Sequence, residues 1–135
     1  MTYAESYAFV CRSLIADVEQ RLGRTLTSDE QRRIWNVGSL MMLEPVERDF
    51  ALKTTLDQIE QFLLELVGWT QRRFDDYCRS AITHLPIWLG RDLTEAERAA
   101  LLRCEHIGVV MEWCDRIHDA VPSEREALFH EWLDA

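Results

Sequence analysis

The chain of 135 residues repeats itself: residues 7–30 recur at residues 74–97, in register and without a gap, 67 positions later. Ten of the 24 positions are identical, whereas unrelated segments of average composition would share roughly one or two. The shared residues of special chemistry or conformation are Cys11, Arg12, Ser13, Gly23, Arg24, Thr27 and Glu30, which return as Cys78, Arg79, Ser80, Gly90, Arg91, Thr94 and Glu97. We therefore predict a tandem duplication, with repeats 1–67 and 68–135 inside one globular domain, 1–135.

Helix signals run from end to end, and strand signals are nearly absent. Thr2, Thr27, Thr94 and Ser123 each stand three residues before a glutamate, which is the spacing of a capping box at a helix start. The fold class expected from these signals is all-α: a six-helix bundle in which each repeat supplies three helices. The expected helices cover residues 2–22, 27–44, 45–67, 70–85, 94–120 and 122–134.

The two repeats are expected to differ in their middle helix. Pro45 and Pro122 both fit the first turn of a helix, but they are 77 residues apart rather than 67. The pattern thus predicts that the second repeat has gained about ten residues within its middle helix, the fifth of the chain. Gly23 and Gly90, by contrast, are expected to play the same part in both repeats, in the left-handed conformation just past a helix end.

The charge of the chain narrows the classes of partner. The net charge is -9, and the two repeats carry -4 and -5 of it, so no acidic tail accounts for the excess. A field of this sign opposes binding to nucleic acid and to anionic membranes. No run of eighteen apolar residues could span a membrane, and the four cysteines form no CxxC pair. We expect a cytoplasmic protein that binds neither nucleic acid nor membrane.

No catalytic motif is present: the chain has no glycine-rich phosphate loop, no HExxH and no GxSxG. The expectation is therefore a protein that is not an enzyme and needs no cofactor. Cys114 and His118 are one helical turn apart and are weak candidates for a metal site or a thiolate–imidazole pair. Two ligands do not make a site, and Cys114 lies on an apolar stripe where packing in the core is the expected role.

Arg12 and Arg79 occupy equivalent places in the repeats. They are expected to hold carboxylates or helix-end carbonyls, and a paired anion site is the alternative.

Candidate binding residues come from the tryptophans and from one acidic helix face. Trp88 and Trp132 are expected to be surface anchors, and Trp113 could serve a homodimer formed through the fifth helix, 94–120. The acidic candidates on that helix are Glu105, Glu112, Asp115 and Asp119.

These features favour a small acidic protein–protein interaction module that inhibits or neutralises another macromolecule, as immunity proteins, anti-defence proteins and chaperones do. One alternative is an acidic decoy that imitates nucleic acid and blocks a nucleic-acid-binding enzyme. Another is an enzyme or a cofactor- or metal-binding bundle with its pocket between the repeats, near Cys114 and His118. A structural subunit of a larger assembly is the third.

Overall fold

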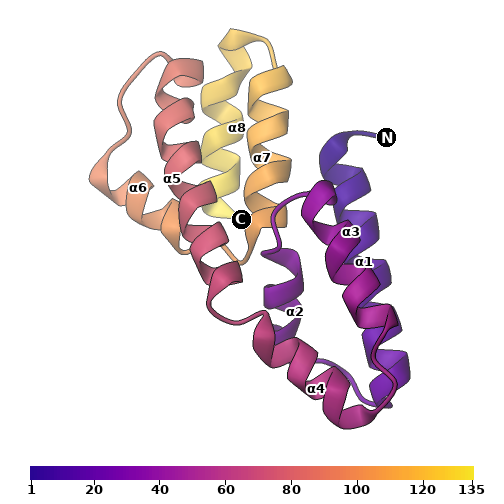
Figure 1. Cartoon of the computed structure of the whole chain (residues 1–135). Coiled ribbons are helices and arrows are strands. Elements are labelled where there is room, and N and C mark those ends of the chain that lie inside the picture. The colour runs from indigo at the N-terminus through magenta and orange to yellow at the C-terminus, as the bar shows by residue number, and fades with distance from the viewer.

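The computed structural model describes the whole chain, Met1 to Ala135, as eight α-helices without a strand (Figure 1). The all-α prediction is confirmed, but six helices were too few. The helices are α1 (Tyr3–Leu22), α2 (Ser28–Trp35), α3 (Leu40–Ala51), α4 (Leu56–Glu65), α5 (Trp69–Leu89), α6 (Glu95–Leu102), α7 (Ile107–Asp119) and α8 (Pro122–Asp134).

In the first half, three helices replace the two predicted over 27–44 and 45–67. Gly38, with φ 102°, turns the chain after α2, and the Ser39 hydroxyl then accepts the Met42 amide at 3.1 Å to start α3. Thr55 forms a capping box with Gln58 at the start of α4. Pro45 therefore lies inside α3 and does not begin a helix.

The second half breaks in the same way. The helix predicted over 94–120 is divided into α6 and α7, and the break precedes His106. The helix predicted to end at residue 85 continues through Pro86 to Leu89. It ends at Gly90, whose φ of 73° equals that of Gly23, so the left-handed helix ends predicted at both glycines are confirmed.

Three of the four predicted capping boxes are present, at Thr2, Thr27 and Thr94. The box predicted at Ser123 is wrong, because α8 begins at Pro122 and has no side-chain cap. The glutamate of that predicted box, Glu126, instead pairs with Arg91.

Each half contains four helices whose starts correspond. α2 and α6 begin 67 residues apart, as do α3 and α7, whereas the spacing is 66 for α1 and α5 and for α4 and α8. The predicted gain of ten residues is therefore wrong, because Pro45 lies inside α3 while Pro122 begins α8. The corresponding helix pairs are α1 with α5, α2 with α6, α3 with α7 and α4 with α8.

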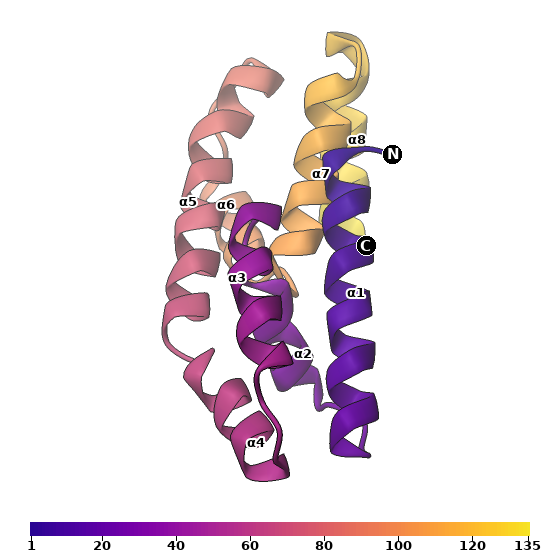
Figure 2. The ribbon, with the colours of Figure 1, turned by 45° about the vertical axis from the view of Figure 1, so that its right-hand side comes forward.

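The long helices organise the packing. α1 contacts α2, α3 and α4, and α5 likewise contacts α6, α7 and α8. The halves meet where α1 packs on α7 and α2 packs on α5, and Figure 2 shows α7 beside α1. One continuous apolar core runs through both halves. None of the eight helices combines the length and the apolar character needed to cross a bilayer.

Polar contacts lock the junction between the halves. The Asn36 side chain is only 2% exposed, and its Oδ1 accepts the backbone amide of Ile107 at 2.9 Å. Arg32 Nε donates to the Glu105 carbonyl at 2.8 Å. The first half thus supplies the hydrogen bond that begins α7, whose own N-cap residue, His106, makes none with its side chain.

Candidate functional site

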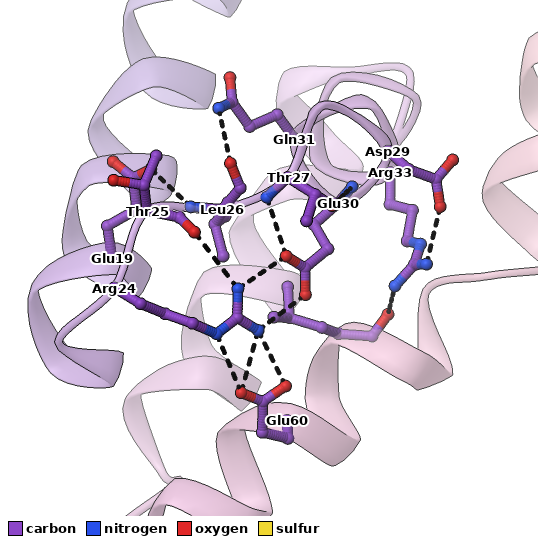
Figure 3. Close-up of polar contacts among 11 residues, drawn as sticks. Glu19, Arg24, Thr25, Leu26, Thr27, Asp29, Glu30, Gln31, Arg33 and Glu60 are labelled. Atoms are coloured by element: carbon purple, nitrogen blue, oxygen red, sulfur yellow. Dashed lines mark hydrogen bonds and ion pairs between the residues drawn. The ribbon is translucent and has the colours of Figure 1, made fainter.

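The repeated polar residues form a clamp at the turn between α1 and α2 (Figure 3). Arg24 follows Gly23, and its guanidinium lies between two carboxylates. Nη1 and Nη2 donate to the two oxygens of Glu30 at 2.8 and 2.9 Å, and Nη2 donates to those of Glu60 on α4 at 2.9 and 3.0 Å. Glu30 also accepts the Thr27 amide at 2.9 Å. The clamp joins the end of α1 to the starts of α2 and α4.

The second half builds the same clamp. Arg91 donates to both oxygens of Glu97 at 2.8 Å, and also to both oxygens of Glu126 on α8. These bidentate bonds to arginine hold the pKa of Glu30 and of Glu97 down at about 2. We call the two networks the arginine clamps. Since every member is engaged within the chain, their role is structural.

The other repeated residues divide between core and surface. Cys11 and Cys78 are fully buried, and burial raises the pKa of each thiol to about 12, so both pack as small apolar groups. Ser13 and Ser80 are exposed.

The two equivalent arginines have different surroundings. Arg12 lies 5.7 Å from the centre of the Trp35 ring, whereas Arg79 pairs with Asp76 at 3.4 Å on an exposed surface. The structure therefore does not bring Arg12 and Arg79 into one shared anion site.

A cleft of about 750 Å³ lies between α1 and α7, a volume in the usual range for a ligand site. Three of the predicted acidic candidates, Glu112, Asp115 and Asp119, line it from α7, and Glu5 lines it from α1. Glu105 is exposed and is not part of the cleft. The structure thus gathers most of the acidic face onto a concave surface.

The base of the cleft is apolar and tightly packed. The rings of Trp35 and His106 stack with centres 4.3 Å apart and planes 9° apart. A Cβ added to Gly108 would stand 2.6 Å from the Trp35 ring, so only glycine lets α7 begin this close to α2. Ala4 and Ala8 complete the base from α1. The acidic groups therefore surround a surface of small and aromatic side chains.

The charges in the cleft are partly uncompensated. Burial raises the pKa of Asp115, and the nearby carboxylate of Asp119 raises it further. Burial also lowers the pKa of His106 to about 4, helped by Arg32 and Arg12, so the imidazole is neutral at pH 7. Its Nδ1 is buried without a hydrogen-bond partner. A cation placed beside Asp115 and Asp119 would relieve their repulsion.

Two arginines also line the cleft, and both already have partners. Arg12 lies over Trp35. Arg116 lies 4.1 Å from the centre of the Trp113 ring and 3.9 Å from Glu131. The free charge that the cleft offers is therefore mainly negative.

The tryptophans predicted as surface anchors are mostly engaged within the chain. Trp132 is only 5% exposed, and its ring stacks on that of Trp113, with centres 6.2 Å apart and planes 4° apart. Trp88 is half-buried beside His84 and His118. The Trp113–Trp132 stack holds α7 against α8, along which it packs.

The first half has a groove between α3 and α4, of about 300 Å³, that the sequence did not reveal. Val46 and Phe62 line its interior, and Asp49 and Glu65 stand among its lining residues. The full lining consists of Met42, Pro45, Val46, Asp49, Phe62, Glu65, Leu66 and Trp69. The neighbouring surface is apolar as well, and Met41 is 82% exposed.

Cys114 and His118 do not converge on a common point. Cys114 is buried, and burial raises the pKa of its thiol to about 12. His118 is exposed and pairs with Asp119 at 3.1 Å. The structure contains no cluster of three or more His, Cys, Asp or Glu side chains that could hold a metal ion.

Sequence reasoning missed three members of the cleft, Trp35, His106 and Gly108. The spacing of Ala4 and Ala8, one turn apart on α1, was a signal that another helix could approach closely. The stacking partners Trp35 and His106 are 71 residues apart, so no local pattern joins them.

Comparison with known proteins finds no matching family model, no matching curated protein and no matching solved structure.

Proposed function

We propose that the protein is a cytoplasmic protein-binding module that inhibits or neutralises another macromolecule, and that it acts by binding and not by catalysis. The observation that carries this proposal is the convergence of Glu112, Asp115 and Asp119 on one cleft with an apolar base. The partner would insert a segment bearing lysine or arginine next to apolar side chains.

The shape of the cleft favours insertion over mimicry of nucleic acid. A nucleic-acid decoy must present its carboxylates as outward rows that match phosphates, whereas here they line a hollow. Arg12 and Arg116 lie among them and would dilute such a field. We therefore place the decoy reading second to binding of a basic protein segment.

The acidic pair gives this binding a predicted pH dependence. A raised pKa at Asp115 means that this carboxylate takes up a proton earlier than an ordinary aspartate as the pH falls. The bound cation would stabilise the charged form. Affinity for the partner is expected to fall as the pH drops below neutrality toward the acidic range.

The test is affinity capture from lysate of the native host or its parasite, at low and moderate salt, with mass spectrometry of the bound proteins. We expect one stoichiometric partner that the Asp115→Asn/Asp119→Asn variant no longer retains. The matched control is Glu124→Gln/Asp134→Asn, which makes the same change in charge at exposed positions outside the cleft. A partner held equally by both variants would refute the cleft as its binding site.

His106 supports a second candidate, a small-molecule site in the same cleft. A neutral imidazole with an unpartnered Nδ1 is a group that an enzyme or a carrier could use. Thermal-shift screening with small metabolites tests it: a ligand that raises the melting temperature of the wild type but not of a folded His106→Gln variant supports this candidate.

The duplication and the homodimer also belong among the proposals. The matching helix starts and the two arginine clamps support descent from a duplicated unit of four helices. A homodimer through 94–120 would use α7, although Trp113 is already stacked on Trp132. Sedimentation over a range of concentrations tests it.

A further inference from the structure

The two halves place different side chains at corresponding positions between their last helices. With the helix starts aligned, Val46 on α3 corresponds to Trp113 on α7, 67 residues later. Leu66 follows α4 as Trp132 lies within α8, 66 residues later, and both are buried. In the second half the two indoles stack and hold α7 on α8. In the first half the smaller pair lines an open groove.

A cation is missing from the groove as well. In the second half Arg116 lies over Trp113 and pairs with Glu131. The corresponding pair in the first half is Asp49 and Glu65, so both positions are acidic.

Only one of these carboxylates is compensated. Lys53 pairs with Asp49 at 3.1 Å, while Glu65 is exposed and forms no ion pair. The groove thus lacks both an aromatic ring and a neighbouring positive charge.

We propose that the α3–α4 groove binds an aromatic side chain of a partner protein, with an adjacent arginine or lysine of that partner paired to Glu65. The ring takes the space that indoles occupy in the other half, and an indole N–H can donate to a rim carboxylate. Pockets of this kind receive the tryptophan and arginine anchors of protein interfaces. This site is separate from the α1–α7 cleft and does not depend on the function proposed for that cleft.

The test uses blocked dipeptides and methyl NMR of the full chain. Acetyl-Trp-Arg-amide is expected to shift the methyl signals of Met42, Val46 and Leu66 in a saturable way. Acetyl-Trp-Glu-amide should bind about fivefold more weakly, because it brings a second carboxylate to Glu65. Acetyl-Ala-Arg-amide should cause no saturable shift. Absence of saturable shifts with the Trp-Arg probe, or equal binding of the Arg and Glu probes, overturns the proposal.

Matched variants assign the effect to the groove. Glu65→Gln should remove the preference for arginine, whereas Glu131→Gln, the corresponding change in the filled half, should leave it intact. Equal effects of the two variants would overturn the proposed ion pair.

Filling the groove supplies the complementary test. Val46→Trp should abolish binding without lowering the melting temperature, and Met42→Trp serves the same purpose if the first variant does not fold. Binding that survives in a folded, filled variant overturns the proposal. Groove signals that change with protein concentration in the wild type but not in Val46→Trp would show that a second copy occupies the groove, which also overturns it.

Discussion

The two halves of the chain share their turns and differ in how their last helices are held. Both carry an arginine clamp with nearly the same bond lengths, and both end their first helix at a glycine with φ 73°. In the second half, however, α8 packs along α7 through two stacked indoles. In the first half α4 packs on α1 and diverges from α3 (Figure 1).

This difference separates two roles that side chains play in one helical plan. The polar clamps fix where each helix begins, because charge-assisted bidentate bonds are directional. The apolar filler decides whether the helices then close on each other, since burial of a large aromatic side chain contributes about 2 to 3 kcal/mol. A chain can therefore keep its turns unchanged and still open a surface by changing Trp to Val and Leu.

The largest expected effect tests the filler. Trp132→Ala should lower the free energy of unfolding by about 4 kcal/mol, because it removes a buried indole and leaves a cavity. Leu66→Ala, the corresponding change, should lower it by about 2 kcal/mol, since its space adjoins a groove that is already open. Urea denaturation of both variants measures the difference, and equal losses would show that the halves are filled alike.

Acidification tests both clamps together. Glu30 and Glu97 have a pKa of about 2 when folded, against an ordinary 4.5. A lowered folded-state pKa gives stability that is complete above about pH 4.5 and is lost as the pH falls toward 2. The loss is expected to be about 3 kcal/mol for the two clamps, after allowance for screening. Urea denaturation at pH 5 and at pH 2.5 measures it, and a double variant, Arg24→Ala/Arg91→Ala, should show a smaller dependence on pH.

Single clamp deletions test whether the clamps are equivalent. Arg24→Ala and Arg91→Ala should each cost about 2 kcal/mol, because each leaves a mostly buried glutamate without its cation. Arg48→Ala is the control: its pair with Glu44 is exposed on both sides, and its loss should cost less than about 0.5 kcal/mol. Costs for the two clamp variants that differ by more than about 1 kcal/mol would contradict their equivalence.

The smallest effect concerns the helix ends. Gly23→Ala and Gly90→Ala should each cost about 1 kcal/mol, because both residues have φ 73° and a Cβ there meets no other atom within 4 Å. Backbone strain alone then sets the cost, so the two values should agree. Gly68→Ala is the control, since its φ lies outside the left-handed region. Thermal melting resolves these shifts.

Local signals in the sequence predicted the ends of helices where a single residue decides them. The capping boxes at Thr27 and Thr94 and the glycines at 23 and 90 act within one turn of the chain, so their effect can be read without knowing the fold. Pro45 misled for the same reason: its ring is tolerated within α3, and Ser39 supplied the real start.

The break before α7 could not be predicted in this way. Residues 103–106 contain neither glycine nor proline, and the break coincides with bonds from Arg32 and Asn36 in the other half. The cleft depends on the same tertiary junction. The α3–α4 groove was within reach, because extending the comparison of the repeats past residue 97 pairs Val46 with Trp113.

The hydrogen bond from Ile107 to the buried Asn36 side chain has a consequence for how the chain folds. Because α7 takes its first acceptor from the far end of α2, its opening turn is complete only when the first half is in place. A fragment that begins at residue 68 would carry α7 with a frayed start. The amide protons of Ile107 and of the core of α1 should therefore exchange with solvent at similar rates, in a single cooperative opening.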